Sequence, residues 1–313
     1  MKNLRNTNPY AEVNWSNTPR VTTSTHMHCL NQETLNSFIS QGLELAAISN
    51  YYPSMPYYPL SSMRENTVRV RQPGYVKDGI WHTDVLNYNE AIAPWCSELP
   101  KASRTQLPFR EGKRLFPNVP EGLLEIPNAE HHYFSDASIY LHVTAPGATL
   151  SSSMFDLKKE FALAEHGYDF GVRLPWRESF QKLYDSLLTP DGGGIVIAHP
   201  SWSHHPISYL EMLLDSDPRI LGIEVSNNCS RIDYSDVSED LWDAILSSGR
   251  QCFGFFVVDH PRPNRNWLGR IVLLPEERTA ESCLRAMRRG RFYGAISGNG
   301  LRFEYIHFDG HML

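Results

Sequence analysis

Two histidines near the start of the chain, His26 and His28, are separated by one residue and follow the alternating run 21–24. That run predicts a strand, in which residues i and i+2 point to the same face. The two imidazoles would then lie side by side where the strand ends, and neutral imidazoles are good ligands for divalent transition metals. An isolated pair is also typical of surface histidines or of buried structural ones, so the interpretation depends on the residues downstream.

Further imidazoles and carboxylates fall at the ends of other predicted strands. They are His199 after the run 194–198, Asp259 and His260 after 255–258, Glu130 just past 123–126, and His142 within or at the end of 139–143. Taken singly, each has a structural explanation, such as a buried hydrogen-bonded histidine or a turn cap. In a parallel barrel the C-terminal strand ends converge on one face, where active sites are built. Five strand ends that each offer a metal-type side chain therefore predict a metal site.

Helices and strands alternate along most of the chain and must position these residues. Helices are predicted near 31–42, 153–166, 175–188, 207–214, 239–248 and 279–289, and strands near 21–28, 43–49, 123–126, 139–143, 195–198, 220–225, 252–258, 270–274, 291–297 and 301–307. This alternation predicts a mainly parallel sheet, in either a barrel or a doubly wound fold. The triple glycine 192–194 precedes a strand and predicts a turn, not a phosphate cradle.

The character of the sequence changes between residues 51 and 120, which are rich in Tyr, Pro and Arg and show no clear period. Proline at this density excludes a helix or a central strand at 51–59. We interpret 51–120 as an insertion with a few short elements, whose aromatic residues either cover an active site or pack as a loop against the barrel wall. Residues 1–20 are predicted to be an extended arm, and 21–313 one domain.

Composition sets limits on the function. The chain has 313 residues and a net charge of −6, which is not the basic surface expected of a protein that binds long nucleic acid. Its five cysteines form no Cys-x-x-Cys pair, which indicates free thiols in a reducing compartment. We find no signal peptide and no run of membrane-spanning length, so we expect a cytoplasmic protein without a membrane partner.

Taken in order, the motifs resemble the PHP (polymerase and histidinol phosphatase) superfamily of metal-dependent phosphoesterases. The matching segments are His26-Met27-His28, Pro127-Asn128-Ala129-Glu130 with His142, Ile197-Ala198-His199-Pro200, Gly222-Ile223-Glu224-Val225 with Asn227, Val258-Asp259-His260, and the ending 288–293. The opening, Asn8-Pro9-Tyr10 and Val13-Asn14-Trp15, is similar to the CehA/McbA-like branches. The likeness spans most of the chain, and it depends on the order and spacing of short motifs.

The resemblance implies an α/β fold, a distorted (β/α)7-type barrel, with a cluster of metals. It assigns one metal to His26, His28, Glu130 and Asp259, and a second to His142, His199 and the bridging Glu130. His260 would belong to a third metal. The other residues expected around that metal are replaced, since Ser24, Ser49-Asn50-Tyr51 and a position near Thr34 stand where the superfamily often has Asp, Thr-Asp-His and an acid or His. We therefore expect two divalent ions (Zn, Mn or Fe) and a lost third site.

The expected function is hydrolysis of a small phosphate ester or nucleotide, in which a metal-activated hydroxide attacks phosphorus in line. The predicted substrate contacts are Arg262, Arg265, Arg270 and Tyr51, although each arginine is also typical of an ordinary solvated loop. His260 or His131 would protonate the leaving group, and His131 could equally orient a metal ligand.

Other functions stay open. The same hydroxide could attack a carbon ester, a carbamate or an amide. A nuclease acting on short oligonucleotides is compatible with the mild charge, and a catalytically degenerate binding module would explain the lost ligands. Substrate identity and oligomeric state are not encoded in any motif.

Overall fold

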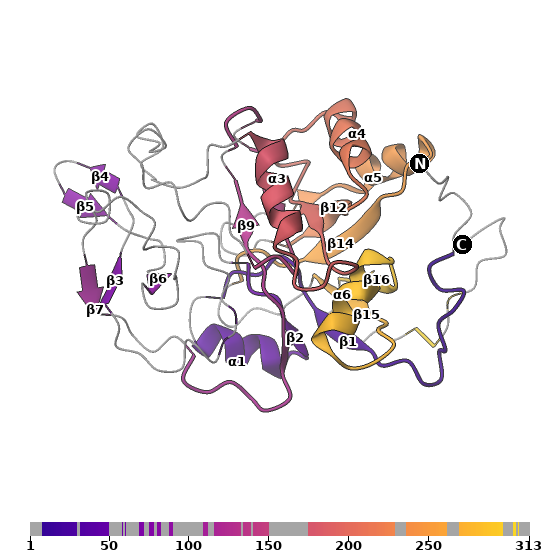
Figure 1. Cartoon of the computed structure of the whole chain (residues 1–313), viewed down its shortest axis with the longest axis horizontal. Helices are drawn as coiled ribbons and strands as arrows, with labels where there is room; N and C mark the ends of the chain where they lie inside the picture. Colours follow the sequence, from indigo (N-terminus) through magenta and orange to yellow (C-terminus); the bar gives the residue numbers. More distant parts are fainter. Residues whose placement is uncertain are drawn as a thin grey trace.

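Helices and strands form a mixed α/β fold in this computed structural model (Figure 1). The structure describes residues 8–29, 32–49, 58, 60, 116–132, 134–138, 140–149, 175–228, 236–261, 269–296, 303–304 and 306, together with short strands between 69 and 111. The helices are α1 (Gln32–Ser40), α3 (Trp176–Asp185), α4 (Ile207–Ser216), α5 (Glu239–Ser247) and α6 (Ala280–Arg288). None of these described helices is long and apolar enough to span a bilayer.

The strands outside the insertion are β1 (Val21–Thr23), β2 (Leu45–Ala46), β8 (Leu124–Glu125), β9 (Glu130–His131), β10 (Val143–Thr144), β11 (Ile195–Ile197), β12 (Ile220–Asn227), β13 (Asp236–Val237), β14 (Phe253–Val257), β15 (Arg270–Leu273) and β16 (Phe292–Ala295). The largest sheet has the order β13-β12-β11-β10-β9, with β14 also paired to β12. A second sheet has the order β1-β15-β16, and β2 pairs with β8.

The strand directions are mixed, so the prediction of a mainly parallel sheet is wrong. β11, β12 and β14 run parallel, because α4 and α5 each return the chain to the edge where the preceding strand began. β10 is antiparallel to both of its neighbours, and β15 is antiparallel to β1 and β16. The pairings among the described residues form separate sheets and do not define a closed barrel.

Backbone hydrogen bonds connect the strand ends of different sheets. The His28 N–H donates to the Asp259 carbonyl at 2.8 Å, which ties the segment after β1 to the segment after β14. The Glu130 N–H donates to the Ser49 carbonyl at 2.9 Å, which ties the start of β9 to the segment after β2. The Ser49 N–H also donates to the Met27 carbonyl at 3.0 Å, so the two pairs of strand ends meet at one place.

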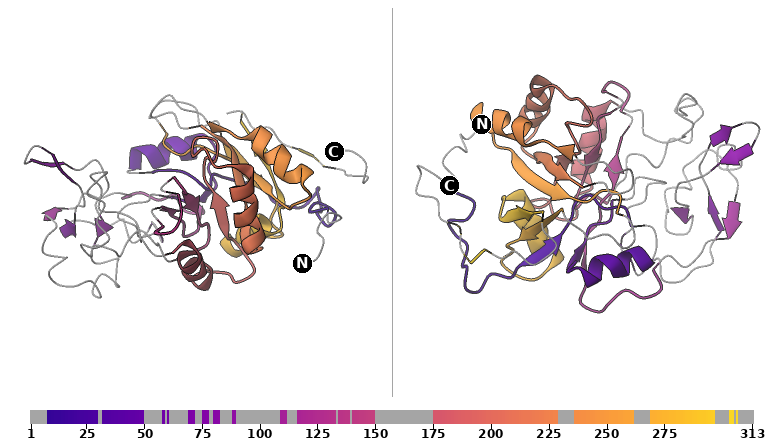
Figure 2. Two further views of the ribbon diagram at one scale, coloured as in Figure 1. Left: turned by 90° about the horizontal axis from the view of Figure 1, so that it is seen from above. Right: turned by 180° about the vertical axis from the view of Figure 1, so that it is seen from behind.

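Helices cover the central strands on both sides. Side chains of α3, α4 and α5 join one buried cluster, and side chains of α6 join another. Figure 1 shows α4 and α5 above β12 and β14 and α6 below them, and the view from behind in Figure 2 again places α6 on the side away from α4 and α5. Along β11, Ile195 and Ile197 join one buried cluster and Val196 joins another, as alternation in a strand requires. Burial of such a side chain contributes about 1.5–3 kcal/mol, which fixes the end of β11 firmly.

The triple glycine leads into β11 as a turn. Gly193 has φ +62, and an added Cβ would lie 2.1 Å from the Pro146 carbonyl oxygen. Its N–H donates to the Leu284 carbonyl in α6 at 2.8 Å. The glycines therefore allow a close approach of backbone segments, and the predicted turn is confirmed.

The described part of the N-terminal arm, 8–20, has turns at residues 9–12 and 15–17, which depart from the extended chain expected there. Tyr10, Val13 and Trp15 pack against a buried cluster at β15 and β16, and the Tyr10 hydroxyl donates to the Phe292 carbonyl at 2.6 Å. The apolar side chains of the arm give it a surface to bury, which an extended solvated arm would lack.

Short strands lie within 51–120, the predicted insertion: β3 (Arg69–Arg71), β4 (Tyr75–Lys77), β5 (Ile80–His82), β6 (Tyr88–Asn89) and β7 (Phe109–Glu111). Near its ends, Leu60 and Phe116 are fully buried and pack with α1. The predicted helix 153–166 and most of the predicted strand 301–307 lie outside the described residues.

Candidate metal centre

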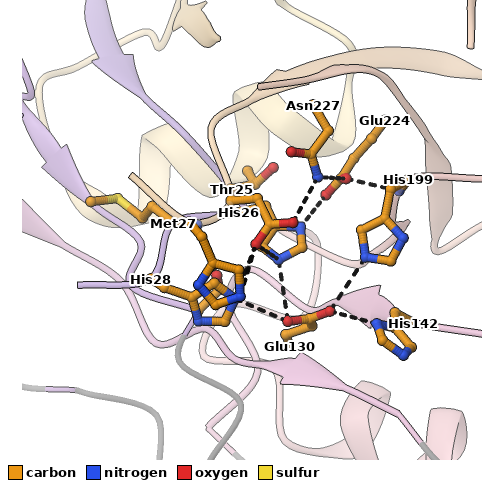
Figure 3. A network of polar contacts seen from close by, with 12 residues as sticks. Thr25, His26, Met27, His28, Glu130, His142, His199, Glu224 and Asn227 are labelled. Atoms are coloured by element: carbon orange, nitrogen blue, oxygen red, sulfur yellow. Dashed lines mark hydrogen bonds and ion pairs between the residues drawn. The ribbon is translucent and has the colours of Figure 1, made fainter. Parts of the chain in front are cut away.

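Six side chains named from the sequence gather in two sets of three. The ligand atoms within each set lie within 4.8 Å of one another, and the sets are His26, His28 and Asp259, and Glu130, His142 and His199. All are buried except His142, which is partly buried. Figure 3 shows Glu130 between the two sets.

The first set forms where β1 and β14 end side by side. Met27 pairs with Asp259 in a parallel bridge, so the two histidines that flank Met27 face the Asp259 carboxylate. His26 Nε2 and His28 Nε2 each lie 3.3 Å from Asp259 Oδ1. The strand alternation expected for His-x-His thus directs both imidazoles to one carboxylate oxygen.

Glu130 turns one carboxylate oxygen to each set. Its Oε2 lies 3.0 Å from His28 Nε2 and 3.3 Å from His26 Nε2. Its Oε1 lies 2.8 Å from His142 Nδ1 and 3.5 Å from His199 Nε2. This is the arrangement that a bridging carboxylate requires.

His142 reaches the site differently from the way the sequence predicted. Of the described residues in the predicted strand 139–143, only Val143 lies in an observed strand, β10, and His142 precedes that strand. Because β10 is antiparallel to β11, its N-terminal end lies beside the C-terminal end of β11, and the Ala198 N–H donates to the His142 carbonyl at 3.0 Å. His142 and His199 therefore meet at the same edge although their strands run in opposite directions.

Two of the six residues have left-handed backbone conformations. His199 has φ 29 and Asp259 has φ 54. Such a conformation costs a residue other than glycine about 1–2 kcal/mol, and it persists where the surroundings fix it. Here the His199 N–H donates to Glu224 Oε2 at 2.9 Å, and the Asp259 N–H donates to the His26 carbonyl at 2.8 Å. Strain of this kind concentrates at functional sites.

The donor atoms fit divalent metal ions. His26 Nε2 and Asp259 Oδ1 are buried without a hydrogen-bond partner although they lie 3.3 Å apart. A buried polar atom left unpaired costs about 1–3 kcal/mol, and a cation held by both atoms would remove that cost. Imidazole nitrogens together with carboxylate oxygens suit Zn, Mn or Fe.

The electrostatics keep the carboxylates ionised. Burial alone would raise the pKa of Glu130, but His26 together with hydrogen bonds from His142 and His199 holds it well below its usual range. The pKa of Asp259 is also lowered, since His26 and His260 outweigh the effect of burial. Conversely, burial would lower the pKa of His26, but Asp259, Glu224 and Glu130 raise it well above its usual value. Cations and protons therefore compete for this site.

The two candidate proton donors differ in their surroundings. His260 stacks on His28 with ring centroids 3.9 Å apart, and its side chain is 22% exposed. His131 follows Glu130 in β9 and is fully buried. Because neighbouring residues in a strand point to opposite faces, the His131 side chain is directed away from the face that carries the Glu130 carboxylate. Burial lowers the pKa of each to about 3. Of the two, only His260 has a surface that a substrate can contact.

Among the predicted substrate contacts, only Arg270 lies within the described residues. It is buried at the start of β15, and its Nη1 donates to the Gln41 carbonyl at 2.9 Å. Burial lowers its pKa. Tyr51, Arg262 and Arg265 lie outside the described residues.

Glu224, for which the sequence predicts no role, lies between the two sets and contacts a member of each. Its side chain is fully buried on β12, and its Oε1 accepts a hydrogen bond from His26 Nδ1 at 2.7 Å. Its Oε2 accepts from the His199 N–H at 2.9 Å and from Asn227 Nδ2 at 2.9 Å. Asn227 Nδ2 also donates to Asp259 Oδ2 at 3.1 Å. The signal was present in the sequence, because a glutamate inside the apolar run 220–225 is costly unless it is partnered.

No model of a known protein family matches the chain, and no curated protein matches its sequence. Among solved structures, it resembles a two-domain protein from Bacteroides vulgatus ATCC 8482 that contains a predicted PHP-like metal-dependent phosphoesterase. The TM-score is 0.50 at 12% identity, and the match covers 92% of this chain and 67% of the other. An identity this low shows a related fold alone. The two ligand sets themselves define a candidate metal centre.

Proposed function

We propose that the protein is a metal-dependent phosphoesterase of the PHP superfamily, near its CehA/McbA-like branches, which hydrolyses a small phosphate ester or nucleotide. The observation that carries the proposal is the Glu130 carboxylate, with one oxygen toward His26 and His28 and the other toward His142 and His199. A carboxylate shared in this way is what two neighbouring cations need.

We infer that residues 21–313 form one cytoplasmic domain, a distorted (β/α)7-type barrel with an insertion at 51–120. Hydrogen bonds between strands of different sheets support the barrel. The Glu44 N–H donates to the Thr22 carbonyl at 3.0 Å between β2 and β1, and the His28 N–H donates to the Asp259 carbonyl at 2.8 Å between the ends of β1 and β14.

His26, His28, Asp259 and Glu130 would hold one divalent cation, and Glu130, His142 and His199 would hold the other. Bound there, Zn, Mn or Fe would supply Lewis acidity that makes a water nucleophilic near neutral pH and would offset charge on phosphate oxygens.

A third cation site is not expected, because the hydroxyls that stand at its positions bind the backbone. Ser24 Oγ donates to the His26 carbonyl at 2.9 Å, and Ser49 Oγ accepts from the Met27 N–H at 2.8 Å.

The chain's own groups fix the ligands. Because Glu224 Oε1 accepts the hydrogen on His26 Nδ1, the lone pair of His26 Nε2 is directed into the site. His199 Nδ1 lies 3.2 Å from Ser203 Oγ, which orients the second imidazole. The rings are thus held in place before a cation or a substrate binds.

We assign His260 to the substrate and not to a cation. Its pKa of about 3 keeps the ring neutral near pH 7, which favours a hydrogen bond to the substrate; protonation of a leaving group would require the substrate's negative charge to raise that pKa. Arg262, Arg265 and Tyr51 stay predicted substrate contacts. Arg270, whose Nη1 donates to the Gln41 carbonyl, also stays a predicted substrate contact.

The test compares an aryl phosphate with the matching aryl carboxylate ester, using metal-loaded protein and its His199→Ala variant. We expect hydrolysis of the phosphate that requires metal and is lost in the variant. Faster hydrolysis of the carboxylate ester than of the phosphate would instead assign the site to hydrolysis at a carbonyl carbon. No turnover and no bound metal would favour a non-catalytic binding module.

A further inference from the structure

Two large aromatic side chains next to the metal centre are exposed to solvent. Tyr140 is 47% exposed and Trp202 is 38% exposed. Their ring centroids lie 5.6 Å apart with an interplanar angle of 85°, so the two rings form a right-angled corner. Exposed aromatic area has a free-energy cost in water that a bound ligand would remove.

This corner is attached to one half of the metal centre. The Trp202 ring lies 4.9 Å from the His199 ring and 5.8 Å from the His142 ring, measured between centroids. Tyr140 precedes His142 by two residues, and Leu141 between them is fully buried. A group that binds at this corner therefore lies within one ring's width of two candidate metal ligands.

The loop that carries Trp202 is held in place by hydrogen bonds. The Ser203 N–H donates to the His199 carbonyl at 3.1 Å, and the His205 N–H donates to the Pro200 carbonyl at 3.1 Å. On its other side, Ser201 Oγ lies 2.8 Å from Ser238 Oγ. The position of the Trp202 backbone is thus tied to that of a metal ligand, which is a requirement for a specificity-determining residue.

The opposite half of the centre has a different surface. There the neighbour is His260, stacked on His28 and close to the Asp259 carboxylate, with its Nε2 3.5 Å from Oδ1. Among the described residues, one side of the metal centre is therefore bordered by polar groups and the other by aromatic faces. A substrate that uses both sides would carry a charged group at the metals and a flat apolar group beside His142 and His199.

We propose that Tyr140 and Trp202 form an aromatic subsite that binds a planar ring, a nucleobase or an aryl group, in the leaving group of the substrate. The inference rests on the proposed function and narrows its substrate class. A planar ring can stack on one aromatic face while its edge meets the other at the right-angled corner. An alkyl leaving group of similar size has no such face and gains little there.

The experiment uses two substrates that are both phosphate esters of primary alcohols, adenosine 5′-monophosphate and glycerol phosphate, with the full, metal-loaded chain. Trp202→Leu should lower kcat/KM for the nucleotide about tenfold or more, the range expected when one base-stacking contact is lost, and change the value for glycerol phosphate less than about twofold. Trp202→Phe, which keeps a flat ring, should retain most of the activity on the nucleotide.

Phe303→Leu is the matched control. Phe303 is also 38% exposed, and it contacts Tyr293, a residue outside the metal centre. It should affect neither substrate. An equal loss on both substrates in Trp202→Leu would overturn the proposal, because it would mean that Trp202 only positions His199. No loss on either substrate would overturn it as well.

A binding measurement separates failure of this proposal from failure of the proposed function. If the unmodified protein hydrolyses neither compound, calorimetry of the metal-loaded chain with the same two compounds decides. Tighter binding of the nucleotide that Trp202→Leu removes would support the subsite even though hydrolysis fails. Equal binding of both compounds in the unmodified chain would overturn it.

Discussion

Replacement of Glu224 by glutamine tests how the metal ligands are held. The carboxylate accepts three hydrogen bonds, from His26 Nδ1, the His199 N–H and Asn227 Nδ2. A glutamine amide has one acceptor oxygen and one NH2 group, so it cannot replace both carboxylate oxygens. Glutamate and glutamine side chains have nearly the same volume, so the effect of the substitution comes from the changes in charge and in hydrogen-bond direction.

Both orientations of the amide are unfavourable. If the amide oxygen faces His199 and Asn227, its NH2 group faces His26 Nδ1 and forces the ring hydrogen onto Nε2. That atom lies 3.3 Å from Asp259 Oδ1 and would no longer be a ligand. If the amide oxygen faces His26 instead, its NH2 group meets two N–H donors. The His199 N–H is then left unpaired at a cost of about 1–3 kcal/mol, and Asn227 Nδ2 keeps only its hydrogen bond to Asp259 Oδ2.

The expected magnitude follows from the loss of a ligand-orienting partner, which typically weakens metal binding 10- to 100-fold. That corresponds to about 1.4–2.7 kcal/mol of binding free energy. We expect Glu224→Gln to weaken Zn or Mn binding to the metal-free protein by this factor in a calorimetric titration. At a pH where the His26 ring is neutral, its 15N chemical shifts should also show a change of tautomer, which a general loss of stability would not produce.

A matched control is Glu211→Gln, which removes a carboxylate that binds Arg250 Nη1 at 2.6 Å on α4. It should leave metal affinity and the His26 tautomer unchanged. Unaltered metal affinity together with an unaltered His26 tautomer in Glu224→Gln would refute the reasoning, since the carboxylate would then be unnecessary for orienting the ligand.

Three further predictions concern the centre and the fold. Glu130→Gln should lower the bound metal more than His142→Ala does, because Glu130 faces both sets of ligands; elemental analysis showing the reverse order would exclude a bridge. Gly193→Ala should lower the free energy of unfolding by more than the about 1–2 kcal/mol expected of Gly122→Ala, because both glycines have positive φ but only Gly193 lacks space for a Cβ; equal losses in urea denaturation would contradict this. Burial lowers the pKa of His205 to about 4, so the folded state binds this proton more weakly than the unfolded state, and the stability contribution present above about pH 6.5 is lost as the pH falls toward 4. His205→Gln should reduce that loss in acid denaturation of the metal-free protein, and an unchanged pH profile would count against it.

The sequence was informative where chain direction decided the geometry. His26, His28, His199 and Asp259 follow β1, β11 and β14, and the ends of such strands meet because the helices between β11, β12 and β14 keep those strands parallel. His-x-His spacing also predicted that both imidazoles share a face. The structure brings all six predicted ligands together, and their role as ligands remains our proposal.

Features that depend on strand pairing were beyond the sequence. Nothing local reveals that β10 is antiparallel to β11, so the route by which His142 enters the site was misread. Ser238 shows the same limit. A serine directly before a helix is a typical N-cap, but the Ser238 side chain forms no cap hydrogen bond to α5, and its hydroxyl lies 2.8 Å from Ser201 Oγ in the loop after β11.

Glu224 was missed for a different reason. In a strand with both faces buried, alternation cannot tell which side chains line a site and which face the hydrophobic core. A buried glutamate needs partners, but the sequence does not name them, and Glu224 lies 198 positions from His26 along the chain. Such a contact becomes visible only when the fold places β12 beside the end of β1.

Anomalous X-ray diffraction from crystals loaded with Mn or Zn tests the central claim most directly. We predict two peaks that share the Glu130 carboxylate, one beside His26, His28 and Asp259 and the other beside His142 and His199. A single peak that Glu130 does not contact, or no peak in a well-ordered site, would contradict the account.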